Sequence, residues 1–393
     1  MKYLPLDLST FSTMMTNNYV YVDKTKYIYD LFSGGLRLYF LARPRRFGKS
    51  LLISTLKELF LGNRELFKGL WIYSSDYQWI KYPIIHLDFA NIRHDTMENF
   101  EAALSWRLQE IAQEYAIDIS NAPTSYAQLS HLIKQLAQAN KVVILIDEYD
   151  KPILDHISDL EKADQIKKLV AGMYDVIKSM DAHIRAIFVT GVTKFAKTSI
   201  FSGMNNLNDI SFSSQSAQLL GYTQEELVHY FGDHIDAVAH NEHVERDEIL
   251  DVMKTWYNGY RFSELPIKVY NPFSTMSYLS RQELANYWFK SGTPTFLIHL
   301  IKKQYNDLQE ILTAAIKSDN LDTFEISNIP LIPLLFQTGY LTIDDYNSKN
   351  DRITLKYPNY EVEESFTKHI VASLADNTSD ENFIITYLAQ DMN

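Results

Sequence analysis

The sequence predicts an α/β fold: a parallel sheet flanked by helices, followed by an all-helical segment and a small α+β module. Three observations support this class. An apolar run at residues 36–41 continues through a short polar loop into a helical pattern. A second run, residues 142–146, is fully apolar and suits a parallel strand buried on both faces. Strand-like and helical runs alternate from residue 36 to residue 214, the order that builds a parallel sheet.

The first motif is the loop after residues 36–41. It ends in Gly48, Lys49 and Ser50, where an amphipathic helix begins. Strand, loop and helix in this order can form a phosphate cradle, because the loop N–H groups and the first helical turn converge where the helix dipole favours negative charge. We expect Lys49 to reach the β- and γ-phosphates of a nucleotide and the Ser50 hydroxyl to ligate Mg²⁺, as in P-loop NTPases.

The loop departs from the P-loop pattern G-x-x-x-x-G-K-[ST]. Arg43 stands where the first glycine is expected, and Pro44 has no N–H to donate. A Gly-Lys-Ser or Gly-Lys-Thr tripeptide arises by chance in roughly one in five chains of this length, so the interpretation depends on its strand, its helix and a partner motif. We expect Arg45 and Arg46 to contact phosphates and to replace the anchoring lost with the first glycine. The predicted nucleotide-binding residues are Arg43, Pro44, Arg45, Arg46, Phe47, Gly48, Lys49, Ser50 and Leu51.

The partner motif is KVVILIDEYD, residues 141–150, which resembles a Walker B element. Its apolar strand ends in paired carboxylates, Asp147 and Glu148. We expect Asp147 to hold Mg²⁺ through its water shell and Glu148 to polarise the attacking water. The alternative is a core strand that ends in acids at a turn.

A further buried strand, residues 184–190, ends on Thr190. A polar side chain at the end of the strand beside a Walker B strand can sense the γ-phosphate, so Thr190 is a catalytic candidate together with Glu148 and Lys49. A threonine that caps a turn is an equally good interpretation.

The remaining elements are predicted from hydrophobic periodicity and from the residues that start and end helices and strands. In the first part we expect short strands at residues 19–25, 82–89 and 209–213, and helices at residues 26–32, 97–115, 126–139 and 161–180. Residues 1–18 appear irregular. The helical segment should contain helices at residues 222–231, 248–257, 273–279 and 282–289, the first of them opened by a capping box at Thr223 and Glu226. A helix at 333–337, strands at 339–344 and 352–357, and a helix at 361–374 suggest a winged-helix-like module.

These elements divide the chain into a P-loop domain at residues 1–214, a helical lid at 215–300, the winged-helix-like module at 301–375, and a tail or the start of a further domain at 376–393. Residues 1–393 have no charged-then-apolar leader and no run of eighteen apolar residues, which predicts a soluble cytoplasmic protein without membrane contact. Cysteine is absent, which excludes disulfides and thiol catalysis.

Charge restricts the partners. The net charge of −12 argues against a broadly basic nucleic-acid surface, yet residues 37–68 carry eight Lys or Arg against two Glu. Anion binding there is plausible, and a solvated basic helix face is the alternative. In the predicted hairpin and last helix of the winged-helix-like module, residues 339–374, four basic residues lie among six acids, so we expect protein packing there and not DNA binding. These basic residues are Lys349, Arg352, Lys356 and Lys368.

Taken together, nine blocks resemble the bacterial AAA-ATPase-like family. They are YVDKT (21–25), FLARPRRFGKSLL (40–52), LIDEYDKPI (145–153), FVTGVTKF (188–195), IFSGMNNLNDIS (200–211), LLGYTQEEL (219–227), WYNGYRF (256–262), VYNPFS (269–274) and YPNYEVEESF (357–366). The resemblance implies an AAA/STAND-like P-loop fold with ATP and Mg²⁺ as cofactors. It also explains the arginine-rich phosphate loop, which is a family trait. Arg261, in the seventh block, is a candidate for a residue that closes on nucleotide.

The resemblance also implies a nuclease-like domain with a PD-(D/E)xK core after the ATPase part. None of the 25 lysines has an acidic residue two positions before it, so the (D/E)-x-K triplet is absent. We therefore expect the chain to stop where that domain would begin, and we do not expect it to cleave DNA.

Two functional hypotheses remain from the sequence. The first is an ATP-binding, Mg²⁺-dependent ATP-hydrolysing protein that couples its nucleotide state to lid movement. The second is a nucleotide-gated switch or interaction scaffold with negligible hydrolysis, which acts on a protein partner, on a second copy of the chain or on a nuclease. The intact Glu148 favours hydrolysis, and Pro44 with its crowded arginines is compatible with slow turnover.

Overall fold

The computed structural model describes residues 1–194, 200, 207–290, 315–321 and 329–375. Five strands form a parallel sheet in the order β2-β3-β4-β1-β5. The strands are β1 (Leu38–Ala42), β2 (Ile84–Asp88), β3 (Val142–Asp147), β4 (Ile184–Gly191) and β5 (Asn208–Asp209). The predicted parallel α/β class is confirmed. The predicted tail at 376–393 lies outside the described residues.

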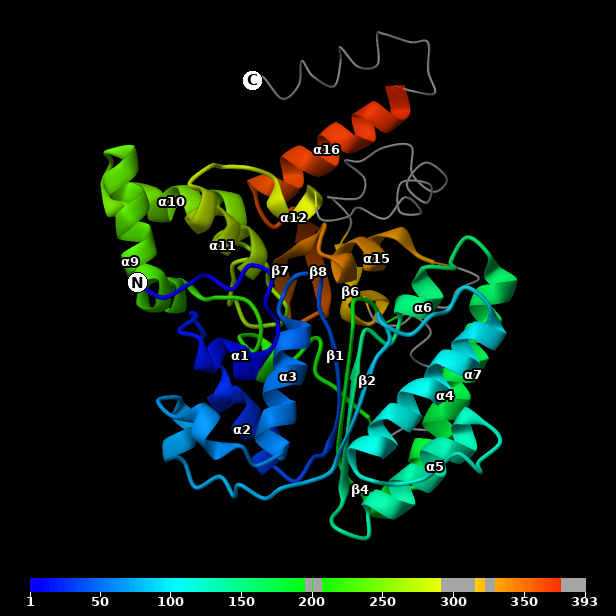
Figure 1. Cartoon of the computed structure of the whole chain (residues 1–393). Helices are drawn as coiled ribbons and strands as arrows, with labels where there is room; N and C mark the ends of the chain where they lie inside the picture. The colour runs from blue at the N-terminus through cyan, green and yellow to red at the C-terminus, as the bar shows by residue number, and fades with distance from the viewer. Residues whose placement is uncertain (195–199, 201–206, 291–314, 322–328, 376–393) are drawn as a thin grey trace.

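Helices cover both faces of this sheet (Figure 1). Side chains alternate across each strand, so Val142, Ile144 and Ile146 face one apolar core while Val143 and Leu145 face the other. The first core contains α4 (Met97–Glu114), α5 (Ser125–Leu136) and α7 (Leu160–Ser179); the second contains α1 (Phe11–Thr16), α2 (Thr25–Ser33) and α3 (Lys49–Phe60). Burial on both faces is why these strands are continuously apolar.

The strand order brings the predicted motifs together. Strand β4 lies between β1 and β3, and Leu41 pairs with Thr190 while Asp88 pairs with Asp147. Since all these strands run in parallel, the loops that leave their carboxyl ends meet at one edge of the sheet.

A helical segment follows the sheet and packs around its own apolar core. It contains α9 (Gln224–Glu242), α10 (Arg246–Tyr257), α11 (Pro272–Arg281) and the short α12 (Tyr287–Lys290). Helix α9 opens with the predicted capping box, in which Thr223 accepts from the Glu226 N–H and Glu226 accepts from the Thr223 N–H. It extends well past residue 231, where the predicted helix ended.

The C-terminal module combines a three-stranded antiparallel sheet with two helices. The sheet has the order β6-β8-β7. Its parts are β6 (Ala315–Lys317), α15 (Leu331–Thr338), β7 (Thr342–Asn347), β8 (Arg352–Lys356) and α16 (Tyr360–Ala375). The prediction missed β6 and started the first hairpin strand at Gly339, whose φ of 94° instead ends α15 in the left-handed region. Short elements complete the described chain: α6 (Lys151–Leu154), η1 (Arg64–Phe67), η2 (Trp71–Ser74), η3 (Asp181–His183), η4 (Ser214–Ser216) and η5 (Ser318–Leu321).

Two predictions for the N-terminal segment were wrong. Residues 19–25 form no strand beyond one isolated bridge between Tyr3 and Tyr19; they alternate because Val20 and Val22 pack into the helical core and Tyr21 packs into the sheet core. Residues 1–18 were predicted to be irregular, but residues 11–16 form helix α1, which buries Phe11.

The helix predicted at residues 282–289 is reduced to α12, because Gln282 adopts a left-handed φ of 57° that ends α11. Within the described part of the chain, no helix combines the length and apolarity needed to cross a membrane.

Candidate nucleotide-binding site

The phosphate loop connects β1 to α3 through a left-handed residue. Gly48 is the N-cap of α3 and has a φ of 92°. An added Cβ would find Leu220 no closer than 3.9 Å, so the backbone conformation and not crowding requires glycine here. Arg46 also has a positive φ, 63°. The loop therefore turns sharply twice and presents the open N-terminus of α3 to the space above the sheet edge.

Lys49 lies inside this loop. Its side chain is buried, and Nζ donates to the carbonyls of Arg43 and Pro44, both at 3.0 Å. Burial lowers the pKa of Lys49, and the nearby carboxylates of Glu148 and Asp147 partly oppose this effect. The ammonium group is thus held at the centre of the loop by neutral carbonyls that a phosphate could replace.

Part of the predicted loop faces away from this space. Arg43 is buried, donates to the carbonyls of Ser211 (2.6 Å) and Ser216 (3.1 Å), and stacks over the Phe262 ring at 4.3 Å. Together with Pro44 it lines a separate cavity of about 260 Å³. Arg43 therefore supports the loop from behind, while Arg45, Arg46, Phe47, Gly48, Lys49, Ser50 and Leu51 line the main cavity.

The acidic motif follows β3 at the same edge of the sheet. Asp147 is buried, and its Oδ1 accepts from the Glu148 N–H at 3.1 Å and from the Thr190 hydroxyl. Glu148 has a φ of 51° and lines the main cavity. Burial raises the pKa of Glu148, an effect that Lys49 opposes and Asp147 reinforces. Thr190 is fully buried behind Asp147 and does not belong to the cavity wall, so its contact is with the acid.

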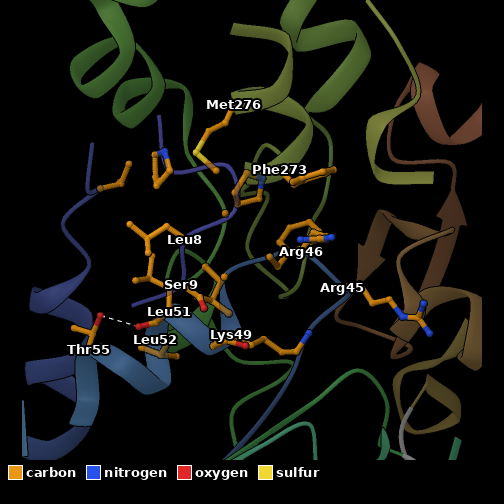
Figure 2. A pocket seen from close by; sticks show the side chains of 18 of the residues that line it. Leu8, Ser9, Arg45, Arg46, Lys49, Leu51, Leu52, Thr55, Phe273 and Met276 are labelled. Atoms are coloured by element: carbon orange, nitrogen blue, oxygen red, sulfur yellow. Dashed lines mark hydrogen bonds between the residues drawn. The ribbon is translucent and has the colours of Figure 1, made fainter. Parts of the chain in front are cut away.

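These groups surround a cavity of about 580 Å³, a size typical of small-molecule sites. At one end lie Lys49, Ser50 and Glu148. The rest of the wall is largely apolar, and it comes from the N-terminal segment, α3, the loop before α9, and α11. Its apolar residues include Leu6, Leu8, Met14, Val20, Val22, Leu51, Leu52, Leu220, Phe273 and Met276. Figure 2 shows Leu8, Phe273 and Met276 projecting around the space above Leu51 and Leu52.

Sequence reasoning missed this apolar wall. Phe273 and Met276 belong to α11, and the Arg46 guanidinium stacks over the Phe273 ring at 4.6 Å. Phe273 lies within the VYNPFS block, which was the one available signal. Leu8 and Ser9 lie in a segment whose sequence appeared irregular. No local pattern links these residues to a loop some 40 positions away.

The phosphate loop is also held from its outer side. The Trp288 indole N–H donates to the Arg45 carbonyl at 3.0 Å. Gly339 approaches so closely that an added Cβ would lie 2.8 Å from Pro44. Phe47 packs edge-on against Tyr260 at a centroid distance of 4.8 Å. The helical segment and the C-terminal module therefore contact the loop directly.

Arg261 does not face the cavity. It is buried, and its guanidinium donates to the carbonyls of Ser263, Leu265 and Asp344 at 3.1, 2.9 and 3.1 Å, and also to that of Glu264. Its role in the structure is to join the WYNGYRF block to the C-terminal module. The basic residues of that module are partly neutralised, since Lys356 pairs with Asp344.

The donor set suits Mg²⁺. Ser50 is exposed on the cavity wall, whereas Asp147 is buried at the end of β3 and does not line the cavity; both candidate ligands are oxygen atoms. Among the described residues, no group of three or more His, Asp or Glu side chains is arranged to hold a metal ion alone. Mg²⁺ normally takes one or two protein carboxylates and completes its shell with water and substrate phosphates. The residues present therefore fit a metal that arrives with a nucleotide.

A parallel sheet with a glycine-capped helix, a buried lysine and a strand-end acid pair at one edge defines a nucleotide-binding protein of the P-loop class. The family described as "Predicted AAA-ATPase" matches residues 5–201. An uncharacterized protein from the vnfD 5′ region of Azotobacter chroococcum mcd 1 is 36% identical over 376 residues, covering 94% of this chain and 70% of that protein. The chain belongs to this AAA-ATPase-like family.

A solved structure, the Aeropyrum pernix ORC2 protein in ADPNP-ADP complexes, aligns with 92% of this chain and 98% of that chain at 12% identity. The TM-score of 0.34 is too low to support any argument about this protein.

Proposed function

We propose that the chain binds Mg²⁺-ATP in the main cavity and hydrolyses it. The observation that carries the proposal is that Lys49 and Glu148 meet on one cavity wall, at the open N-terminus of α3. A polyanion there would satisfy the free N–H groups of the helix and the buried ammonium together. The cavity of about 580 Å³ has room for a nucleoside against the apolar wall beside these residues.

Phosphate binding replaces weak contacts with stronger ones. Lys49 now donates to two neutral carbonyls, and charge-assisted bonds to phosphate oxygens are roughly twice as strong. Arg45 lines the same cavity and adds positive charge to it, whereas the Arg46 guanidinium lies over the Phe273 ring at the apolar end. Ser50 and Asp147 would hold the metal, with Thr190 fixing the orientation of Asp147. When bound, Mg²⁺ neutralises charge on the β- and γ-phosphate oxygens.

Glu148 is the general base in this proposal. Its carboxylate accepts a proton from the water that attacks the γ-phosphorus, and the bond to the ADP leaving group breaks. Burial raises the pKa of Glu148, which makes its carboxylate a stronger base than an exposed one. A positioned general base typically contributes about 10²- to 10⁴-fold to the rate.

The base of the nucleotide would bind at the apolar end. Phe273 offers a ring face already flanked by Arg46, and Leu8 and Met276 close the sides. Because Phe273 and Met276 belong to α11, nucleotide binding would bias the position of the helical segment. This is the coupling to a lid that the sequence suggested.

A nucleotide-gated switch with negligible turnover is the second candidate. The contact between Trp288 and Arg45 favours it, because the nucleotide state of the loop would reach the helical segment without chemistry. In that case bound ATP would set the conformation recognised by a protein partner.

The test compares the wild type with Glu148→Gln, using Glu110→Gln on an outer helix as the matched control. ATP affinity and phosphate release are measured with Mg²⁺ present. The ATPase proposal predicts equal affinity in all three proteins and a loss of turnover of roughly 10²-fold or more in Glu148→Gln alone. Binding without turnover in the wild type would favour the switch, and equal turnover in Glu148→Gln would refute the role of Glu148.

A further inference from the structure

The carboxyl ends of β3 and β4 are joined by hydrogen bonds beyond the strand ladder. The Asp150 carboxylate accepts from the N–H of Val192 at 3.2 Å, and from the N–H and hydroxyl of Thr193, both at 2.8 Å. The Tyr149 hydroxyl donates to the Thr193 carbonyl at 3.0 Å, and the Tyr149 N–H donates to the Thr190 carbonyl at 3.0 Å. We call these five residues, Tyr149, Asp150, Thr190, Val192 and Thr193, the strand-end clamp.

The clamp is tightly packed. Asp150 is 1% exposed and Thr193 is fully buried, yet Asp150 belongs to the cavity wall. An added Cβ on Gly191 would lie 2.5 Å from the Tyr149 ring and 2.8 Å from Asp150 Oδ1, so only glycine fits between them. A buried carboxylate is tolerated when N–H and O–H donors surround it, which is the arrangement here.

Glu148 lies between Asp147 and Asp150, and hydrogen bonds hold both of these acids at the carboxyl edge of the sheet. Its own N–H donates to Asp147 Oδ1, and its carbonyl accepts from the Lys151 N–H at 3.0 Å. The φ of 51° places this glutamate in the left-handed region, which is unfavourable for a residue that carries a Cβ. Such a conformation persists only when its neighbours impose it. On the carboxyl side of Glu148, the residues of the strand-end clamp impose this conformation.

We propose that Asp150 is a positioning residue for Glu148: through the clamp it holds the left-handed turn that directs the Glu148 carboxylate into the nucleotide cavity. The inference rests on the proposed function, since it assigns the geometry of the proposed general base. Nothing in the Walker B pattern itself requires an acid at this position.

Steady-state kinetics give the proposal a second readout. A positioning residue acts on the reacting geometry and not on nucleotide binding, so its loss lowers kcat while KM and ATP affinity stay near those of the wild type. A residue that only supports the fold would lower ATP affinity, thermal midpoint and kcat together.

The experiment uses Asp150→Asn, which keeps the shape of the side chain, and Thr193→Val, which removes one clamp hydrogen bond but no charge. Glu114→Gln on the surface of α4 is the matched charge control. For each protein, ATP affinity, kcat, KM and the thermal midpoint are measured. We expect kcat to fall roughly ten- to hundredfold in Asp150→Asn, with KM and ATP affinity near those of the wild type. In Thr193→Val we expect about a threefold loss of kcat, again without a change in ATP affinity.

An unchanged kcat in both clamp variants overturns the inference. So does a parallel loss of ATP affinity, thermal midpoint and kcat, because that result indicates a structural role only. If Asp150→Asn does not fold, an unchanged kcat in Thr193→Val overturns the inference alone. A wild type that binds ATP without releasing phosphate refutes the proposed hydrolysis, whereas turnover that is insensitive to Asp150 refutes only the positioning role.

Discussion

The two ends of the main cavity are built differently. At the end where we propose that the phosphates bind, hereafter the phosphate end, Lys49 and Glu148 are held by loop carbonyls and strand-end hydrogen bonds at the edge of the parallel sheet. At the apolar end, Leu8, Phe273 and Met276 converge from the N-terminal segment and α11, held by side-chain packing. The phosphate end is therefore organised for charge before any ligand binds. The apolar end depends on how two distant segments are placed.

The two ends should therefore contribute to ligand affinity in different ways. Charge-assisted bonds at the phosphate end should distinguish nucleotides by their phosphates, and burial at the apolar end should act on every ligand that carries a base. Each end can be tested by comparing ATP with adenosine, which lacks phosphates.

The largest effect is expected from Lys49→Ala. It removes the buried ammonium, so ATP affinity should fall roughly hundredfold, while adenosine affinity should stay within about twofold. Isothermal titration with both ligands measures this. Lys57→Ala, a lysine on the same helix outside the cavity wall, is the matched control. Equal losses for ATP and adenosine would show that the two ends are not separate.

Phe273→Ala tests the other end. Loss of a ring that stacks on the base should weaken ATP, ADP and adenosine alike, by about tenfold each. The same titrations apply, with Trp106→Ala, an exposed aromatic residue on α4, as control. A loss confined to ATP would place the base elsewhere and would break the comparison.

The smallest effect concerns pH. Burial lowers the pKa of Lys49 below the usual 10.5, and ATP favours its protonated form. ATP affinity should therefore fall as the pH rises through this lowered pKa, by up to about tenfold per pH unit above it, at pH values where an exposed lysine is still charged. The affinity for adenosine should not change over this pH range, because adenosine carries no phosphate. ATP affinity that is flat up to the usual lysine pKa would contradict the buried state of Lys49.

The phosphate end was predictable from the sequence, and the apolar end was not. The strand, loop and helix around Gly48 and the acids after β3 are contiguous in sequence, and their periodicity and residue types carry the chemistry. The sheet was predictable for the same reason. The apolar wall was not, because Leu8 and Phe273 meet only after folding.

Local conformation was equally hidden from the sequence. The alternation of residues 19–25 indicated a strand, but it arises because Val20 and Tyr21 enter different cores. Arg43 was predicted to bind nucleotide because of its position in the loop, and only the structure shows it directed toward Ser211 and Ser216. Residue type and spacing do not define the direction of a side chain at a sharp turn.

The proposed nucleotide site is tested most directly by a crystal structure of the wild-type chain with Mg²⁺ and a non-hydrolysable ATP analogue. We expect the β- and γ-phosphates within about 3 Å of Lys49 Nζ, with Glu148 facing the γ-phosphate and the base against Phe273. A nucleotide bound outside this cavity, or inside it in the reverse orientation, would refute the proposed site.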